Sequence, residues 1–402
     1  MKLANQQIIK GGNLKKIFML INESEGISRA KLARLTSLSK VAVSTLVEEL
    51  IMGGFVSDKG AVIANKMGRH SNMLVVNQTG KAIMVFHWLP KEIEVRLISL
   101  DDSCLESYAI TNSETIDYIK ETKKMYYEME KRAAGKTDIL GVCIISPSTL
   151  SPSDESILSS ILTIPEDDTV IKELRAEIPE TPLAFFNDTA CFAYAELPVV
   201  NQVENMNSWL FLNLNKGIGA VILSGANMLG GASGNTTEFG HFSVERYGER
   251  CACGNCGCLE NRVGEKALNK RAIEFRLSGI NETSQVTYKS VAEGLYSKQE
   301  GYREFCQALA EDLAYAIGNL ITVHNLQDII IGGRGQVLGE GFLEMLKEQF
   351  PQNGFHGFVA KTELRYSERK PEDKSEFVGA AKYFFAKHFS FTKSIQGQTL
   401  LY

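Results

Sequence analysis

The chain lacks any apolar run long enough to cross a lipid bilayer, although 44% of its 402 residues are hydrophobic. Its N-terminus is polar, carries Lys2 and Lys10, and has no apolar core before Gly11, which does not fit a signal peptide. No short-period repeat is present, and only residues 65–80 could form a low-complexity linker. These absences predict a soluble cytoplasmic protein, and a chain of this length is expected to hold two or three domains.

Charge is distributed unevenly along the chain. Residues 1–80 hold 11 Lys and Arg against 5 Asp and Glu, a balance of +6, whereas the remainder has a balance of −11. A basic N-terminal segment on an acidic body indicates a small module that meets a polyanion. Charge alone does not distinguish such a module from an ordinary basic surface.

Residues 14–53 have the periodicity of three helices. Apolar side chains recur at helical spacing from Leu14 to Ile21. Ser28 can cap a short helix, and after a tight turn Ser39 can cap a longer helix that a pair of glycines ends. This order predicts a helix-turn-helix, whose last helix enters the DNA major groove. Two short strands around a turn, a wing, are predicted next in FVSDKGAVIANKMGRHSNMLVVN.

The expected recognition helix begins with small and cationic side chains, which allow a helix to approach base edges and phosphates. Within the predicted wing, Gly68-Arg69 could place a guanidinium in or near the minor groove. A three-helix packing module that does not bind DNA is the alternative interpretation. On the DNA-binding interpretation the expected contact residues are Ser28, Arg29, Ser39, Lys40, Ala42, Ser44, Thr45 and Arg69.

Four of the eight cysteines lie within eight residues, and a histidine precedes the first by ten. Imidazole and thiolates are the ligands of tetrahedral structural zinc, and two glycines among the cysteines let the backbone fold tightly around one ion. A disulfide framework is the alternative, but the other cysteines are scattered and no signal peptide precedes them. Five candidate ligands compete for four positions, and chemistry alone leaves open whether Cys256 or Cys258 closes the loop. The five are His241, Cys251, Cys253, Cys256 and Cys258.

From Gly80 onward the periodicity changes. Short apolar or alternating runs, such as ILGVCIIS and WLFLNLN, are separated by helical stretches such as 114–134. Later stretches, among them 263–278 and 302–325, have the pattern of amphipathic helices around a strand at 327–333. Strands interleaved with helices indicate an α/β body.

Together these segments resemble the ROK family (repressors, open reading frame proteins and sugar kinases), and specifically its transcriptional regulators. The resemblance spans nearly the whole chain, and the cysteine cluster CACGNCGCLE is its most specific part. The residues that carry it are the helix-turn-helix of 14–53 with Gly68-Arg69, Asn187-Asp188, GIGAVILSG at 217–225, Glu238 to His241, the cysteine cluster with Glu260, and IIIGG at 329–333.

The resemblance implies a winged helix-turn-helix followed by two actin-like, ribonuclease H-like α/β lobes with a sugar cleft between them. The expected domains are the winged helix at 1–75, a first lobe at 76–195 completed by a C-terminal helix at about 376–402, and a second lobe at 196–375 with a zinc-binding loop at 241–260.

The resemblance also implies site residues. One structural zinc per chain would be bound by His241, Cys251, Cys253 and Cys258, leaving Cys256 as a spare thiol. The expected ligands of a sugar are Asn187, Asp188, Glu238, His241 and Glu260. Such residues suit the role, because carboxylates and amides form paired hydrogen bonds with neighbouring hydroxyls.

Departures from the family's kinases decide between enzyme and regulator. Sugar kinases of this family carry an Asp-x-Gly-x-Thr phosphate loop, where this chain has Leu89-Pro90-Lys91, and Asn215-Lys216-Gly217 alters a second phosphate motif. Phosphoryl transfer depends on positioning phosphates and metal, so no kinase activity is expected. Thr237 also replaces a glycine that lies near the sugar in the family.

The sequence therefore predicts a DNA-binding transcriptional regulator, a repressor of carbohydrate-related genes. It would act as a homodimer on double-stranded operator DNA and sense a sugar or sugar phosphate, without contact with a membrane. Two alternatives are a sugar kinase of the same family and a regulator whose body serves only as a dimerisation scaffold.

Overall fold

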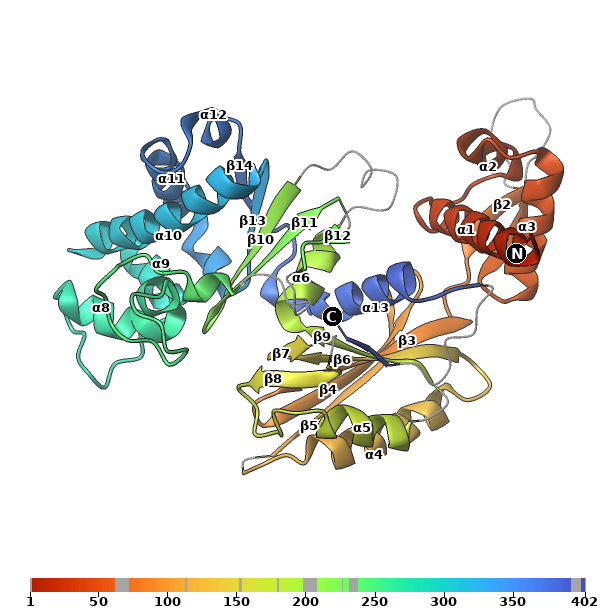
Figure 1. Cartoon of the computed structure of the whole chain (residues 1–402), viewed down its shortest axis with the longest axis horizontal. Coiled ribbons are helices and arrows are strands. Elements are labelled where there is room, and N and C mark those ends of the chain that lie inside the picture. The colour runs from red at the N-terminus through yellow and green to blue at the C-terminus, as the bar shows by residue number, and fades with distance from the viewer. Residues whose placement is uncertain are drawn as a thin grey trace. The chain divides into compact units, whose positions relative to one another are not determined.

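The computed structural model describes residues 2–61, 72–112, 114–151, 154–178, 181–197, 208–225, 227–230, 238–391 and 399–401. Two compact units divide the chain: Met1–Glu204 with Glu376–Tyr402 forms unit 1, and Asn205–Ser375 forms unit 2. Figure 1 shows their elements. Arg69 and Thr237, which the sequence analysis singled out, lie outside the described residues. Within those residues, no helix combines the length and apolar character needed to cross a membrane.

Unit 1 begins with a winged helix-turn-helix, here called the N-terminal module. The Ser28 and Ser39 side chains accept hydrogen bonds from backbone N–H groups at the starts of α2 and α3, which fixes where both helices begin. Ile17, Leu32 and Val43 are fully buried in the core that the helices share. The elements are α1 (Lys2–Asn22), α2 (Arg29–Thr36), α3 (Lys40–Met52) and the antiparallel wing strands β1 (Val56–Ala61) and β2 (Asn72–Val76).

The body of unit 1 is a six-stranded sheet in the order β15-β9-β6-β3-β4-β5. Strands β3, β4 and β5 run antiparallel, whereas β6, β9 and β15 run parallel to β3. The strands are β3 (Lys81–Leu89), β4 (Glu92–Ser99), β5 (Cys104–Thr111), β6 (Asp138–Ser146), β9 (Leu183–Asn187) and β15 (Thr399–Leu401), with a separate hairpin of β7 (Ser148–Ser151) and β8 (Ser156–Ser160).

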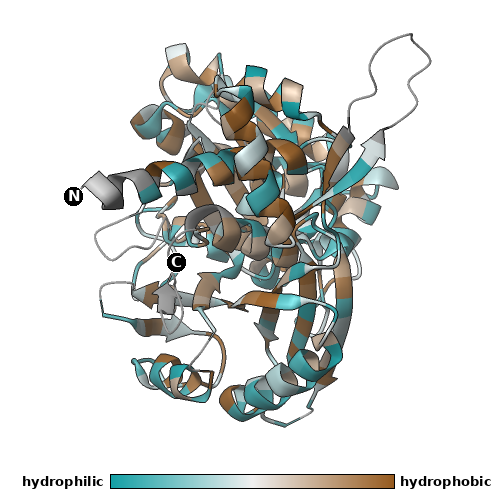
Figure 2. Ribbon diagram, turned by 90° about the vertical axis from the view of Figure 1, so that its right-hand side faces the viewer, coloured by the Kyte–Doolittle hydropathy of each residue, from teal (hydrophilic) through white to brown (hydrophobic). Residues whose placement is uncertain are grey.

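Helices cover both faces of this sheet, as Figure 1 shows. Phe86 and Trp88 of β3 belong to the core that α4 and α5 share, whereas the intervening His87 lies against the ring of Phe377 on α13. This alternation follows from the two-residue period of a strand. Figure 2 shows that helices carry both polar and apolar residues, which is expected when one face of a helix packs against a sheet and the other face is exposed. The helices are α4 (Tyr118–Ala133), α5 (Thr169–Glu177), α6 (Asp188–Glu196) and α13 (Ser375–Lys387).

Helix α13 lies directly against α6. A Cβ atom at Gly379 would overlap the carbonyl oxygen of Cys191, so this close approach requires glycine. Four residues later, the ring centroid of Tyr383 lies 4.0 Å from that of Tyr194 on α6. The C-terminal helix therefore packs along the helix that begins at Asp188.

The end of α13 and the residues after it complete the core of the N-terminal module. Phe18 and Phe55 of the module meet three C-terminal phenylalanines, with ring centroids as close as 4.9 Å for Phe18 and Phe385 and 4.8 Å for Phe55 and Phe391. The Lys15 ammonium donates a hydrogen bond to the Phe389 carbonyl at 3.2 Å. The aromatic cluster, as named below, comprises Phe18, Phe55, Phe385, Phe389 and Phe391.

Unit 2 is built on a five-stranded sheet in the order β12-β11-β10-β13-β14, in which β10, β13 and β14 are parallel. Its core lies between the sheet and the long helix α10. The strands are β10 (Ser208–Leu214), β11 (Ile218–Ser224), β12 (Asn227–Met228), β13 (Asp328–Gly332) and β14 (Glu363–Tyr366). The helices are α7 (Glu260–Val263), α8 (Leu268–Glu274), α9 (Tyr288–Tyr296), α10 (Tyr302–His324), α11 (Gly339–Gln349) and α12 (His356–Val359), with 3-10 turns at η2 (Phe239–His241), η3 (Glu265–Ala267), η4 (Arg334–Leu338), η5 (Phe350–Gln352) and η6 (Pro371–Asp373).

One expected helix is broken in the structure. The stretch 263–278 was predicted as a single amphipathic helix, but α7 ends at Val263 and α8 begins at Leu268. Gly264 has extended backbone angles, and a Cβ there would lie 2.7 Å from the Glu260 carbonyl oxygen. Apart from this break, the predicted fold class is confirmed: a winged helix-turn-helix precedes an α/β body in unit 1, and unit 2 is also α/β.

Candidate functional site

The clearest site is a group of four side chains in unit 2. One ligand atom each of His241, Cys251, Cys253 and Cys258 lies within 4.8 Å of the others. The His241 Nδ1 to Cys251 Sγ distance is 3.6 Å, and the two remaining sulfur atoms are 3.7 Å apart. A tetrahedron with metal–sulfur bonds of about 2.3 Å has sulfur–sulfur edges of about 3.8 Å. The spacing and the donor set therefore fit one zinc ion.

Backbone hydrogen bonds shape the loop around this group. The Cys251 N–H donates to the Asn255 carbonyl at 2.8 Å, and the Gly257 N–H donates to the Glu249 carbonyl at 2.8 Å. Gly257 has a φ of +67°, in the left-handed region that favours glycine. Cys256 is outside the four-residue group, and its carbonyl instead accepts a hydrogen bond from the Ser243 hydroxyl at 2.8 Å. The four grouped residues are those that the family resemblance implied.

The other candidate sugar ligands of unit 2 lie beside this group in sequence. Glu238 is exposed and directly precedes the 3-10 turn that ends at His241. Glu260 begins α7, and its Oε2 accepts a hydrogen bond from the Ile218 N–H at 3.0 Å. A Cβ at Gly217 would lie 2.5 Å from that oxygen. Glycine at 217 thus lets the Glu260 carboxylate lie against the turn between β10 and β11.

The candidate sugar ligands of unit 1 lie where β9 ends and α6 begins. The Asn187 side chain caps α6 by accepting from the Thr189 N–H at 2.9 Å, and its amide donates to the Ser148 carbonyl at 3.1 Å. Asp188 Oδ1 also accepts from the Thr189 N–H, at 2.7 Å. Burial raises the pKa of Asp188, while the nearby His87 acts in the opposite direction. The structure places Asn187 and Asp188 in unit 1, and Glu238, His241 and Glu260 in unit 2.

Two residues near Asp188 were not predicted from the sequence. His87 and Glu376 are 5% and 3% exposed, and His87 Nδ1 lies 3.2 Å from Glu376 Oε1. Among the described residues, His87 Nε2 and Glu376 Oε2 are buried without a hydrogen-bond partner. A histidine inside the apolar run of β3 was the available signal, but its partner lies 289 residues later in the chain.

In the N-terminal module, the predicted DNA contacts divide into two groups. Ser39, which caps α3, is exposed, as are Lys40 and Thr45 on α3, whereas Ala42 and Ser44 are partly buried. Within the part of the chain that the structure describes, Lys40 makes no ion pair. The Ser28 and Ser39 hydroxyls cap α2 and α3 respectively.

Arg29 has a structural partner on each side. Its guanidinium contacts Glu48 on α3 at 2.7 Å and Asp58 on β1 at 2.9 Å. These ion pairs join α2, α3 and the wing, which the sequence did not predict. Arg29 is therefore held within the module rather than extended toward solvent.

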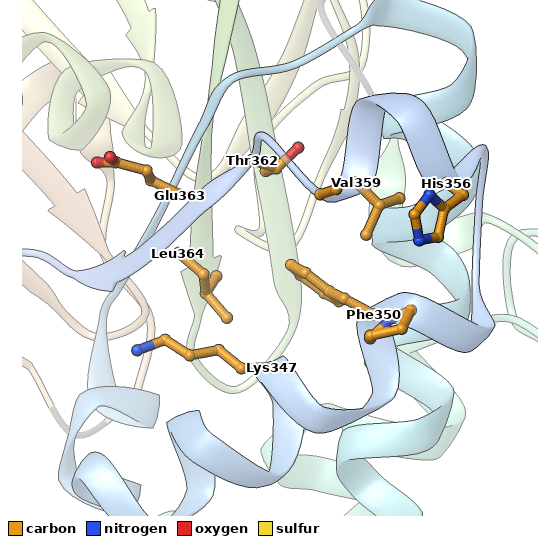
Figure 3. Close-up of a pocket in the computed structure, with 9 residues that line it drawn as sticks. Lys347, Phe350, His356, Val359, Thr362, Glu363 and Leu364 are labelled. Atoms are coloured by element: carbon orange, nitrogen blue, oxygen red, sulfur yellow. The ribbon is translucent and has the colours of Figure 1, made fainter.

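A separate cavity of about 400 Å³ lies in unit 2 beside the edge strand β14. Phe350, Val359 and Leu364 line its apolar part, as Figure 3 shows, and Lys347 and Glu363 supply charged groups. The predicted site residues are absent from its lining.

A family model described as the ROK family matches residues 90–387, which is most of the chain. The chain belongs to the ROK family. A xylose repressor of Caldicellulosiruptor bescii is 24% identical over 402 residues, covering 97% of this chain and 99% of that protein. The family predicted from the sequence is confirmed.

Solved structures of ROK proteins share the fold. A ROK family transcriptional regulator, a homologue of the E. coli MLC protein, has a TM-score of 0.77 at 20% identity and covers 93% of this chain and 96% of its own. A ROK hexokinase from Thermus thermophilus has a TM-score of 0.62 at 18% identity and covers 77% of this chain and 100% of its own. The family fold thus occurs in both regulators and kinases.

Proposed function

We propose that the chain is a DNA-binding transcriptional repressor of carbohydrate-related genes, which responds to a sugar or sugar derivative and has no kinase activity. The observation that carries this proposal is a winged helix-turn-helix, with Lys40 exposed at the start of α3, joined to a ROK body. Support comes from the xylose repressor that aligns with 97% of this chain, N-terminal module included. Two modules in a homodimer would bind a pseudo-palindromic operator.

The candidate sugar ligands would act as hydroxyl-binding groups. Asn187 and Asp188 offer an amide and a partly buried carboxylate, and Glu238 and Glu260 offer two more carboxylates. His241 can donate from the ring nitrogen that does not bind metal. Because carboxylates accept hydrogen bonds and these side chains carry no positive charge, the set favours a neutral polyhydroxylated ligand.

One ground for excluding kinase activity is the turn between β3 and β4. It reads Leu89-Pro90-Lys91, and proline has no N–H group to donate to a phosphate. The turn also accepts hydrogen bonds from neighbouring segments. The Tyr118 hydroxyl donates to the Leu89 carbonyl at 2.8 Å, and the Asn112 N–H donates to the Lys91 carbonyl at 3.0 Å. These contacts stabilise a bulky turn in place of an open phosphate loop.

The second phosphate motif, in unit 2, is occupied by protein groups. Asn215 Oδ1 accepts from the Arg334 N–H at 3.0 Å, and its amide donates to Asn213 Oδ1 at 2.9 Å. The Asn215 N–H donates to the Gly217 carbonyl at 3.0 Å. Backbone N–H groups that cradle a phosphate must be available to it, and the Asn215 N–H is already engaged.

Helix α13 offers a physical connection between ligand binding and the N-terminal module. Its first turn holds Glu376 beside His87, near Asp188. Its middle contacts α6 at Gly379, and its end contributes Phe385 to the aromatic cluster. A ligand that moves the start of α6 would act on the same helix that supports the module.

The metal group is proposed as one structural zinc per chain. Its four protein ligands complete a tetrahedral set, which leaves no open position for chemistry. The ion would hold the loop from His241 to Cys258 and the α7 start at Glu260. Its role is to keep His241 and Glu260 in place.

DNA binding is tested with the full chain and a pool of duplexes of random sequence, from which bound duplexes are recovered and enriched. Affinity for the enriched duplex should fall steeply as salt rises. Lys40→Ala should weaken binding and reduce the salt slope by about 1 if the ammonium contacts a phosphate. Lys289→Ala on α9 removes the same charge from unit 2 and should leave affinity unchanged. Failure to enrich any duplex would contradict the repressor function.

The sugar response is tested by thermal melting with a panel of sugars and sugar phosphates. A ligand that binds only the native state raises the melting temperature. Asp188→Ala and Glu260→Ala should abolish that increase and leave DNA binding intact, because neither residue lies in the N-terminal module. Sugar-dependent release of ADP from ATP and magnesium, lost in Asp188→Ala, would establish the kinase instead. A body that binds no sugar would favour the dimerisation scaffold.

A further inference from the structure

The start of α3 exposes an apolar side chain that the predicted DNA contacts did not include. Val41 is the second residue of the helix and is 77% exposed. Its neighbours Val43, Leu46 and Val47 are buried in the core of the module, so the exposed position is not needed for packing. Val41 therefore presents apolar surface at the end of α3 that is expected to face base edges in the DNA-binding function.

Thr45 lies one turn further along the same face. Its hydroxyl donates a hydrogen bond to the Val41 carbonyl at 3.1 Å. This bond uses the only proton that the hydroxyl can donate, and the side chain still carries a methyl group. Thr45 is exposed, so Val41 and Thr45 form a stripe that offers apolar contact and no side-chain donor.

The surroundings of the stripe suit a polyanion. Lys31, Arg34 and Lys40 are exposed and make no ion pair among the described residues. Glu48, the next residue on the face after Thr45, is paired with Arg29 at 2.7 Å, although Arg29 also pairs with Asp58, so the repulsion of phosphates by Glu48 is only partly offset. The module that carries the stripe therefore has three unpaired cations, and the carboxylate on the stripe's own face has a cationic partner.

We propose that Val41 and Thr45 read the C5 methyl groups of thymines in the major groove, which makes them determinants of the operator sequence. The inference rests on the proposed DNA-binding function. Thymine is the base that presents a methyl group in the major groove, and apolar side chains recognise it by contact. Residues four apart on a helix rise by about 6 Å, whereas base pairs rise by about 3.4 Å. The two methyl groups should therefore lie about two base pairs apart in each half-site.

The test uses the full chain and the duplex enriched from the random pool. Each thymidine is replaced in turn by deoxyuridine, which removes only the methyl group, and Kd is measured by fluorescence anisotropy at one salt concentration. Loss of one buried methyl contact should weaken binding about fourfold. Two thymidines per half-site, about two base pairs apart, should show this loss.

Variants then assign each methyl group to a residue. Val41→Ala should weaken binding to the thymidine duplex and abolish the difference between thymidine and deoxyuridine at one position only. Thr45→Ser keeps the hydroxyl and removes the side-chain methyl, so it should abolish the difference at the other position. Met52→Ala is the matched control, because Met52 is 78% exposed at the opposite end of α3 and should leave both differences intact.

Three results would overturn the inference. If no duplex is enriched, the DNA-binding function fails and the inference fails with it. If a duplex binds but no deoxyuridine substitution changes Kd, DNA binding stands and thymine reading is wrong. If Val41→Ala weakens binding to thymidine and deoxyuridine duplexes equally at every position, Val41 contacts something other than a thymine methyl group.

Discussion

Replacing Cys253 by serine tests the metal centre with little disturbance to the core. Cys253 is exposed, whereas Cys251 and Cys258 are buried, so Cys253→Ser removes a thiolate without also removing core packing. Cys256→Ser is the matched control, because Cys256 lies in the same loop and outside the ligand group. Both variants make the same chemical change three residues apart.

The magnitude follows from the number of ligands. Structural zinc binds with about 10–16 kcal/mol in small zinc-dependent folds, so one ligand of four accounts for roughly 2.5–4 kcal/mol. Its loss should raise the zinc Kd by about 10²–10³-fold. The loop also packs Phe242 and Val244 against the core of unit 2, so weaker zinc binding should destabilise that unit. A loss of about 3 kcal/mol corresponds to a fall of about 6–12 °C in the melting temperature of a unit of this size.

Two measurements check this prediction. Zinc content per chain is measured after dialysis against a chelator of graded strength, and thermal unfolding is followed on the same samples. Wild type and Cys256→Ser should each retain about one zinc per chain, and Cys253→Ser should lose it at the weakest chelator. Full retention of zinc by Cys253→Ser, or equal loss by Cys256→Ser, would refute the ligand assignment.

Two further predictions concern the packing of α13 and the ionisation of Asp188. Gly379→Ala should destabilise unit 1 by about 1–3 kcal/mol in urea unfolding, because the new methyl group overlaps Cys191. Gly341→Ala is the control: it is exposed on α11 with open space around it and should stabilise the chain by about 0.5–1 kcal/mol. Equal effects of the two substitutions would contradict the tight contact at Gly379. Burial raises the pKa of Asp188 above its ordinary value of 3.8, so the native state binds this proton more tightly than the unfolded state does. The free energy of unfolding should therefore fall as pH rises from below 3.8 through the raised pKa. Asp188→Asn removes this ionisation, so the stability of the variant relative to wild type should increase as pH rises over the same range. A pH-independent difference in stability between the two proteins would show that the pKa of Asp188 is not raised.

Local chemistry explains why parts of the fold could be predicted. Ser28 and Ser39 precede helical patterns, and capping needs only the residues that follow within a turn. The cysteine cluster is equally local, because all its ligands lie between His241 and Cys258. Patterns that are complete within about 20 residues can be interpreted without knowledge of the rest of the chain.

Interactions between distant segments could not be predicted in this way. His87 and Glu376 form a buried pair although they lie 289 residues apart, and the local sequence around either residue does not identify its partner. Arg29 was predicted to contact DNA because of its charge and position, but its guanidinium forms ion pairs with Glu48 and Asp58 inside the module. A charged side chain in a basic module has two possible partners, the protein and the nucleic acid, and only the structure shows which protein groups are within reach.

The aromatic cluster has a consequence for the order in which the chain is made and folds. Phe18 and Phe55 emerge from the ribosome long before Phe385, Phe389 and Phe391, since 330 residues separate Phe55 from Phe385 (385 − 55). At about 5–20 residues per second, the interval between Phe55 and Phe385 lasts roughly 16–66 seconds. Throughout that interval the nascent N-terminal module has its aromatic surface uncovered, and unit 2 is synthesised before the residues that cover it. The core of the N-terminal module is therefore completed only after residues 385–391 are synthesised, so a ribosome that stops before them releases a chain whose N-terminal core is incomplete.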